Sequence, residues 1–223
     1  MKSGTSFSKI KILPILALVF YFFLVLSTFV SGIDDFQLGF AEGTENAKSA
    51  SNKMTYYVSI KPRNGVLSFP DTVMNLKTNS AVSFKYDNVA LIKADKNAVH
   101  DRLVIKYQVL SNIMMLLIFV LVILFPIYFV KIMFSMKNGV VFEKKNIRWV
   151  RRIGEFLLMY YLFNYIFDWS QYKINNTLFE FNEYVVEKAS TDLIWLLLGI
   201  IVLLFAEILT KGTILKEEQD LTI

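Results

Sequence analysis

Four long apolar segments dominate the pattern of hydrophobic and polar positions along this chain. They cover residues 12–30, 110–134, 153–169 and 193–209. A helix rises about 1.5 Å per residue, so about 20 apolar residues cross the roughly 30 Å of hydrocarbon in a bilayer. A core helix of a soluble protein shows a polar stripe, and the central parts of the second and fourth segments show none. The pattern therefore predicts four transmembrane helices.

A strand-like alternation of apolar and polar residues follows the first apolar segment. Two stretches, residues 54–61 and 81–86, each place three apolar side chains on one side: Tyr56, Val58 and Ile60, and Val82, Phe84 and Tyr86. Turn residues at positions 63–65 and 69–71 separate these stretches. We expect a small antiparallel sheet of three to five strands.

These elements divide the chain into three parts. The expected fold class is an all-α membrane protein with four transmembrane helices and a small β-rich extracytoplasmic insertion between helices 1 and 2. Residues 1–31 form the cytoplasmic N-terminus and first helix, residues 32–108 the insertion, and residues 109–223 three helices with a basic cytoplasmic loop and an acidic cytoplasmic tail. Within the insertion, residues 41–52 are predicted as a polar linker. Residues 98–108 fit either a last strand or an outward extension of the second helix.

Basic residues gather beside two of the segment ends, which predicts how the chain is threaded. Lys2, Lys9 and Lys11 precede the first segment without an acidic neighbour. The stretch between the second and third segments holds Glu143 against seven basic residues: Lys131, Lys137, Lys144, Lys145, Arg148, Arg151 and Arg152. Short loops rich in Lys and Arg stay in the cytoplasm. Both termini are therefore predicted to be cytoplasmic, and the more acidic loop 170–192 to be external.

The first segment has a second interpretation, a cleavable signal peptide. Lys9 and Lys11 precede an apolar core that ends near Ser31 and Gly32, where cleavage would fall. This core of about 18 residues exceeds the 7–15 residues that are typical of signal peptides. We therefore expect a retained membrane anchor, whereas cleavage would reduce the number of spans to three.

Composition limits the chemistry that the chain can carry. It has no cysteine and one histidine, His100, which excludes thiolate metal sites and multi-histidine zinc sites. No phosphate-binding glycine loop, HExxH motif or serine nucleophile elbow is present. We therefore expect no catalytic residue, no metal site, no cofactor and no enzymatic activity. Asn175-Asn-Thr177 matches the acceptor pattern for glycosylation in an external loop.

The formal net charge of +5 raises the question of nucleic acid as a partner. Attraction to anionic lipids, at about 1 kcal/mol per basic residue near the surface, already accounts for the basic residues at positions 144–152. The expected partner is thus the lipid bilayer, with no direct contact to nucleic acid.

Four polar side chains fall on one face of the third apolar segment. Tyr161, Asn164, Tyr165 and Asp168 follow the i, i+3, i+4 and i+7 spacing of a helix face. Polar residues within a membrane are costly, so this face is a candidate wall of a ligand or ion path. The alternative is interhelical hydrogen bonding, worth about 0.6 kcal/mol per contact. Both interpretations remain open at the level of the sequence, and the second is favoured.

Two acidic residues near the cytoplasmic ends of the helices have cations nearby. Glu155 lies one turn after Arg151 and Arg152, and Glu207 lies four residues before Lys211. These spacings predict ion pairs within each helix rather than a proton-carrying carboxylate pair.

Small and rigid residues predict features of helix packing. Gly199 and Ala206, seven residues apart, form a small-residue strip suited to close contact with another helix. Pro126 predicts a kink or a local break in the second apolar segment.

Two blocks carry a resemblance to a known family. The first is Lys137-Asn-Gly-Val-Val-Phe142 with Asn146 and Arg151-Arg-Ile-Gly154, and the second is Phe205-Ala-Glu-Ile-Leu-Thr-Lys-Gly212 with the tail 215–223. Over roughly residues 113–223 the chain resembles the bacterial integral-membrane family known as domain of unknown function 2975. The resemblance implies four spans, a bacterial inner-membrane location and a neighbouring gene for a small helix-turn-helix regulator. It supplies no catalytic residues.

These observations lead to two functional hypotheses. The first is a non-enzymatic sensor or anchor whose cytoplasmic loop and tail contact lipid or a partner such as a helix-turn-helix regulator. The residues expected to make this contact are Lys144, Lys145, Arg148, Arg151, Arg152, Glu217 and Glu218. The alternative is a small transporter or channel subunit that uses the polar face of the third segment. Four spans are few for a pore, so this alternative requires a homo-oligomer.

Overall fold

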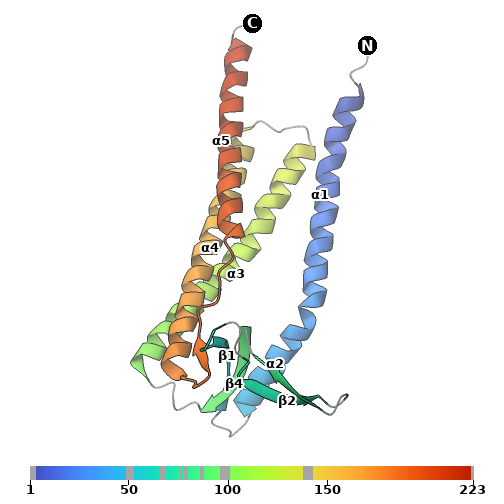
Figure 1. Ribbon diagram of the computed structural model, residues 1–223. Coiled ribbons are helices and arrows are strands. Elements are labelled where there is room, and N and C mark those ends of the chain that lie inside the picture. Colours follow the sequence, from blue (N-terminus) through green and yellow to red (C-terminus); the bar gives the residue numbers. More distant parts are fainter. Residues whose placement is uncertain are drawn as a thin grey trace. The chain divides into compact units, whose positions relative to one another are not determined.

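Helices make up most of the protein, and its strands form a small β-rich part. The computed structural model describes residues 4–48, 53–65, 69–75, 77, 80–85, 88–95, 101–137 and 143–221. In chain order, the elements are α1 (Gly4–Ser31), α2 (Ile33–Lys48), β1 (Lys53–Pro62), β2 (Asp71–Asn75), β3 (Ser80–Phe84), β4 (Asn88–Asp95), α3 (Arg102–Lys137), α4 (Lys144–Leu178), β5 (Tyr184–Val186) and α5 (Ile194–Leu221) (Figure 1).

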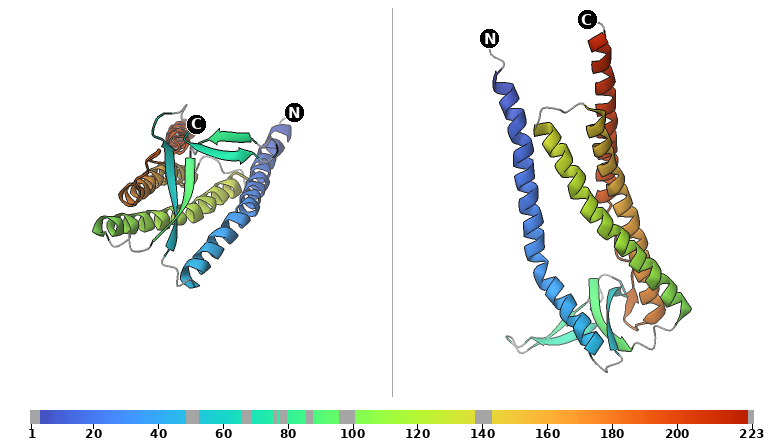
Figure 2. Two further views of the ribbon diagram at one scale, coloured as in Figure 1. Left: turned by 60° about the horizontal axis from the view of Figure 1, so that its bottom comes forward. Right: turned by 180° about the vertical axis from the view of Figure 1, so that it is seen from behind.

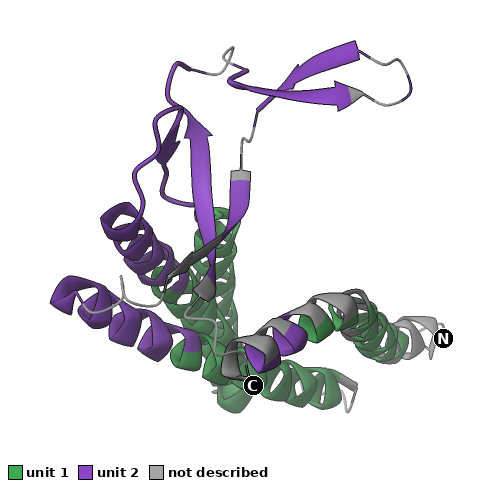
Figure 3. Ribbon diagram, turned by 90° about the horizontal axis from the view of Figure 1, so that it is seen from below, with its two compact units in different colours: residues 1–37, 116–163, 192–223 green, residues 38–115, 164–191 purple. Residues whose placement is uncertain are grey.

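The chain forms two compact units (Figure 3). The first contains Met1–Gln37, Leu116–Phe163 and Asp192–Ile223, and is helical. The second contains Leu38–Met115 and Asn164–Thr191, and holds the five strands of the described residues. Helices α2, α3 and α4 each contribute residues to both units.

The four predicted apolar segments fall in α1, α3, α4 and α5, and the last of them begins one residue before its helix. Two of these helices begin at an aspartate that caps the helix. The Asp101 carboxylate accepts a hydrogen bond from Leu103 N at 2.8 Å, and the Asp192 carboxylate accepts one from Ile194 N at 3.0 Å. Such a side chain satisfies one of the backbone N–H groups that a helix start leaves unpaired. Helix α3 continues through Pro126, so the predicted local break does not end it.

In the helical unit, α4 and α5 lie beside each other (Figure 2). Two glycines allow the first half of α4 to pack closely against α5. A Cβ atom added to Gly154 would lie 2.8 Å from Leu203 Cδ2, and one added to Gly199 would lie 2.7 Å from Leu158 Cδ2. Leu158 follows Gly154 by four residues in α4, whereas its partner Gly199 precedes Leu203 by four residues in α5. The two helices therefore run antiparallel. The close contact predicted for Gly199 is confirmed, whereas the matching role of Gly154 was not predicted.

Helix α3 packs against the same pair of helices. Ile132 of α3 forms a buried cluster with Ile153 and Leu157 of α4. Val202 of α5 and several aromatic and aliphatic side chains of α3 and α4 surround this cluster. Ala206, the second member of the predicted small-residue strip, is completely buried. Apolar packing thus holds α3, α4 and α5 together in this unit.

The second unit is built around an antiparallel sheet with the strand order β4-β1-β5. Its core contains Val58 and Ile60 of β1 with Tyr184 and Val186 of β5. Partly buried aromatic residues from the end of α4 and the segment after it cover these side chains: Tyr172, Phe179 and Phe181. The apolar side of β1, which the alternation in the sequence predicts, therefore faces the hydrophobic core of this unit.

Strand β5 was not predicted, because residues 170–192 were interpreted as an external loop. The structure instead extends α4 to Leu178 and pairs Tyr184–Val186 with the end of β1. The pairing places Val186 opposite Ile60, and both side chains are buried in the same cluster. Burial of these apolar side chains on the sheet favours a strand over a solvated loop.

Strands β2 and β3 form a separate two-stranded hairpin. The side of β3 that carries Val82 and Phe84 was predicted to be apolar, yet Val82 stays exposed and Phe84 is only partly buried. The Tyr184 hydroxyl donates a hydrogen bond to the Asp71 carboxylate, which connects the start of β2 to the core of the larger sheet. Tyr86 and His100 lie outside the described residues.

Two further predictions for the insertion are resolved by the helices. The polar linker predicted at residues 41–52 is wrong for its first part, because α2 continues to Lys48. Phe36 and Phe40 lie one helical turn apart in the preceding part of α2. The alanine and glutamate residues that follow them favour continuation of the helix. Of the two alternatives for residues 98–108, helix is correct from Arg102 onward.

The contacts at the glycines predict how the free energy of unfolding changes when a side chain is added there. We expect Gly199→Ala to lower the free energy of unfolding by about 1–3 kcal/mol, because its Cβ would meet the Leu158 side chain and the Leu158 backbone N at 3.1 Å. Gly43→Ala in α2 is the matched control, because nothing lies within 4 Å of its added Cβ. That control should be neutral or slightly stabilising, since alanine favours helix. Thermal unfolding of the full chain in detergent measures both, and an equal response would contradict the packing.

Candidate functional site

Ion pairs join the N-terminal part of α4 to the middle and to the C-terminal part of α5. Lys144 Nζ lies 2.9 Å from Glu217 Oε1, and Arg151 Nη2 lies 3.1 Å from Glu207 Oε2. Lys144 of the loop and Glu217 of the tail were both predicted to contact lipid or a partner. In the structure, the two residues form an ion pair with each other.

One predicted ion pair is confirmed and the other is wrong. Arg152 Nη1 lies 3.0 Å from Glu155 Oε2, one helical turn away, as the spacing within α4 predicted. Glu207 was expected to pair with Lys211 on its own helix, but it pairs with Arg151 of α4. The antiparallel contact of α4 and α5 presents the guanidinium group to Glu207 from the neighbouring helix.

These ion pairs are partly open to solvent. The Arg151 and Glu207 side chains are 47% and 58% exposed, and those of Lys144 and Glu217 are 74% and 55% exposed. Ion pairs of this exposure contribute about 0–1 kcal/mol each, since water and salt screen them. Their effect is therefore to orient the charged groups more than to stabilise the helix pair.

A groove of about 640 Å³ lies beside these ion pairs. It is lined by Lys144, Ile147, Arg148, Arg151, Thr210, Thr213, Ile214 and Glu217. The hydroxyls of Thr210 and Thr213 donate to the backbone oxygens of Ala206 and Leu209, each at 2.9 Å. These hydroxyl protons are thus occupied within α5.

The cations of the basic segment differ in their surroundings. Arg148 is exposed and, among the residues that the structure describes, has no carboxylate partner. Lys145 does not line the groove, and its Nζ lies 5.2 Å from the centroid of the Trp149 ring. Glu218 is exposed near the end of α5. Arg148 is therefore the groove cation whose charge the described carboxylates leave uncompensated.

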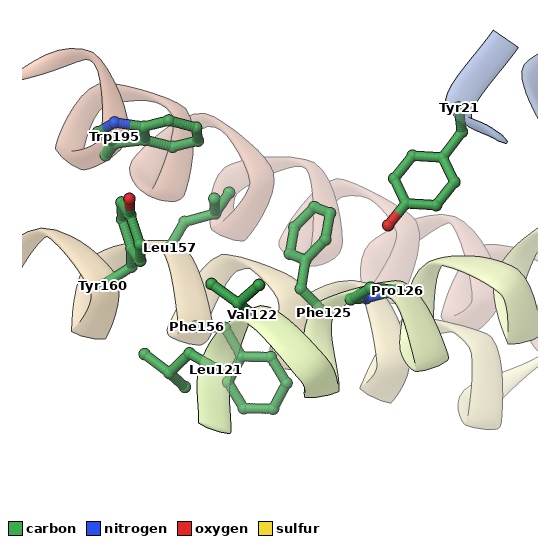
Figure 4. A pocket seen from close by; sticks show the side chains of 9 residues that line it. All are labelled: Tyr21, Leu121, Val122, Phe125, Pro126, Phe156, Leu157, Tyr160 and Trp195. Atoms are coloured by element: carbon green, nitrogen blue, oxygen red, sulfur yellow. The ribbon is translucent and has the colours of Figure 1, made fainter. Parts of the chain in front are cut away.

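An apolar cavity of about 240 Å³ lies between helices of the same unit (Figure 4). Its lining comes from α1, α3, α4 and α5: Tyr21, Leu121, Val122, Phe125, Pro126, Phe156, Leu157, Tyr160 and Trp195. Tyr160 and Trp195 pack edge to face at one end, with ring centroids 5.1 Å apart. Figure 4 shows the Tyr21 hydroxyl directed toward Phe125 and Pro126. This cavity was not predicted, and its signal in the sequence is the aromatic pair Phe156 and Tyr160, which lie one helical turn apart on α4.

Asp168 and Tyr165 of the predicted polar face of α4 make contacts with the segment that follows the helix. Thr191 donates its hydroxyl hydrogen to the Asp168 carboxylate at 2.7 Å, and Lys188 Nζ lies 3.3 Å from the centroid of the Tyr165 ring. Tyr161 and Asn164 are partly buried. A role of this face in a ligand or ion path stays a prediction.

The segment that matches the glycosylation pattern has a structural role at its first residue. The Asn175 amide donates a hydrogen bond to the Tyr57 carbonyl oxygen at 2.9 Å, and the residue is only 5% exposed. Asn175 thereby ties the end of α4 to β1. The amide nitrogen that would accept a glycan is buried in this contact.

In the part of the chain that the structure describes, two helices are long and apolar enough to cross a membrane. They are Arg102–Met136 and Ile194–Gln219, and among the described residues α1 adds a shorter apolar helix, Pro14–Phe23. Only 6% and 11% of the most apolar stretches of the two long helices are buried, whereas the core helix of a soluble protein is mostly buried. Exposed apolar surface of this extent favours association with a membrane.

A family model described as "protein of unknown function (DUF2975)" matches residues 66–223. The chain belongs to this family. The match begins well before residue 113, so the family's pattern includes much of the β-rich insertion, which the sequence resemblance left out. Searches of curated proteins and of solved structures found no match.

The cross-helix ion pair predicts a charge-swap result. Arg151→Glu and Glu207→Arg should each destabilise the α4–α5 pair by placing like charges together, and the double swap should recover about 0.2–1 kcal/mol of this loss. Lys145→Glu combined with Glu207→Arg is the control, because Lys145 contacts Trp149 and should show no coupling. Thermal unfolding of the full chain at low salt measures the cycle. Equal coupling in both pairs would contradict the assigned contact.

Proposed function

We propose that this protein is a non-enzymatic sensor or anchor of the bacterial inner membrane. In this proposal α1, α3, α4 and α5 span the bilayer, the termini are cytoplasmic and the β-rich unit is external. The low burial of the two long apolar helices supports a membrane location. The concentration of lysine at the start of the chain and in the first turns of α1, and of lysine and arginine around the start of α4, supports the orientation.

Helix α4 is the least apolar of the four proposed spans, because it contains Glu155, Asn164 and Asp168. Glu155 pairs with Arg152, and Asp168 accepts a hydrogen bond from Thr191. Polar groups with such partners are less costly at or near a membrane than isolated ones. Their contacts therefore support including α4 among the spans.

One observation carries the proposal of a sensor: α4 takes part in both units. Its C-terminal part packs Tyr172 against the sheet and bonds Asn175 to β1. Its N-terminal part pairs Lys144 with Glu217 near the end of α5 and Arg151 with Glu207 in the middle of α5. A ligand or a stress at the sheet that favours one conformation of α4 over another would shift the balance between those conformations. Such a shift is what a conformational signal requires.

The proposed partner is a small cytoplasmic protein such as a helix-turn-helix regulator. The contact surface would consist of the basic segment at the start of α4 and the acidic end of α5, including Glu217 and Glu218. Opposite charges on one surface give specificity and orientation to an encounter more than raw affinity.

The orientation can be tested with single cysteines, because the chain has none of its own. We expect a membrane-impermeant maleimide to label Glu180→Cys in intact spheroplasts and to label Glu218→Cys only after the membrane is permeabilised. Both positions are exposed, so both variants should react fully in detergent. Labelling of Glu218→Cys in intact spheroplasts would overturn the proposed orientation.

The partner contact can be tested by affinity purification from native cells. We expect recovery of a specific small protein to fall about tenfold when Glu217 and Glu218 are both changed to Gln, the loss that removal of about 1.4 kcal/mol of charge pairing produces. Glu180→Gln with Glu183→Gln, two exposed acids of the β-rich unit, is the matched control. Unchanged recovery both after deletion of residues 216–223 and after replacement of the basic segment would reject the sensor hypothesis.

A further inference from the structure

We propose that the groove between the start of α4 and the end of α5 binds an anionic phospholipid, with Arg148 holding the phosphate. This inference rests on the proposed membrane location and assigns a ligand to the basic end of the helix pair. It concerns one lipid in one site, which differs from general attraction of a basic surface to a membrane.

The charges around the groove leave room for one negative charge. Three cations line it, and two of them face carboxylates: Lys144 pairs with Glu217, and Arg151 pairs with Glu207. Arg148 has no such partner among the described residues. A single phosphodiester, with one negative charge, would compensate the remaining positive charge. The planar guanidinium group can bind two phosphate oxygens at once.

The remaining lining of the groove fits the apolar part of a lipid. Ile147 and Ile214 supply aliphatic surface. The threonine hydroxyls at positions 210 and 213 donate to backbone oxygens of their own helix, so they do not offer free donors to an anion. An isolated phosphate ion would therefore find one cation that lacks a carboxylate partner among the described residues, and much apolar wall.

The volume of the groove agrees with a lipid of which only part is bound. About 640 Å³ lies within the 300–1,000 Å³ that are typical of small-molecule sites. This space suits a headgroup and the first part of the acyl chains. The rest of the chains would then extend along the exposed apolar side chains of α5, such as Ile208.

The test is lipid binding to the purified full chain, measured by native mass spectrometry in a neutral detergent. We expect phosphatidylglycerol to remain bound at concentrations where phosphatidylcholine does not. Arg148→Gln should weaken phosphatidylglycerol binding about tenfold, the loss expected when a bidentate charged contact is removed. Lys145→Gln is the matched control, since it removes the same charge one turn earlier on α4 but outside the groove, and it should change binding by about twofold or less.

Three results would overturn the inference. The first is equal weakening by Arg148→Gln and Lys145→Gln, which would indicate diffuse surface attraction. The second is equally tight binding of phosphatidylcholine. The third is displacement of the lipid by inorganic phosphate at comparable concentration, which would indicate a simple anion site. Arg148 is exposed, so the variant should unfold at the same temperature as the parent chain, and this measurement confirms that the site is intact.

The outcome is separate from that of the proposed function. Binding to the detergent-purified chain does not depend on which side of a membrane the groove faces. A failed labelling experiment would therefore reject the orientation, whereas a failed lipid experiment with correct labelling would reject the lipid site alone.

Discussion

The close approach of α4 and α5 at two glycines determines where the ion pairs and the groove between these helices lie. Gly154 admits Leu203, and Gly199 admits Leu158, with leucine side chains filling the space that a Cβ atom would need. Two such contacts, one turn apart and in opposite directions, fix both the orientation and the register of the helices. Small residues allow this packing, which is the usual route to helix association where the hydrophobic effect between helices is weak.

The ion pairs and the groove then occupy positions that this register dictates. Arg151 lies three residues before Gly154, and Glu207 lies four residues after Leu203, so the two side chains meet across the interface. The next turns outward bring Lys144 to Glu217 and leave Arg148 between the two ion pairs along the helix. Weak, half-exposed charge contacts could not hold this arrangement alone. Close packing of the two helices sets this arrangement, and the charged side chains determine which ligands the groove can bind.

Much of the fold could be predicted from the sequence because its strongest signals are local. Long apolar runs identify all four long helices, and alternation with Tyr56, Val58 and Ile60 identifies β1 and its buried side. Strand β5 has three residues, too few for an alternation pattern to be recognised. Its stability comes from pairing with β1, which is far away in the sequence.

The candidate site was predicted as a set of residues but not as an arrangement. The sequence identifies the basic segment and the acidic tail, yet it offers Lys211 as the nearest partner of Glu207 because local spacing is all it contains. Choosing Arg151 requires the register of α4 against α5. The contact at Gly154 was likewise not predicted, because the leucine that fills its space lies on another helix. The apolar cavity has linings from four helices and no continuous motif.

The pairing of β1 with β5 has a consequence for the order in which the chain can fold. Lys61 of β1 contacts Glu187, which is 126 positions later in the sequence, and α3 and α4 are synthesised in between. A chain that emerges from the ribosome N-terminus first therefore makes β1 long before the strand that completes its edge. Until then, that edge of β1 exposes unpaired backbone groups, which are prone to pair with other chains. The sheet is thus among the last parts of the protein to close, and an early stop after α3 would leave it open.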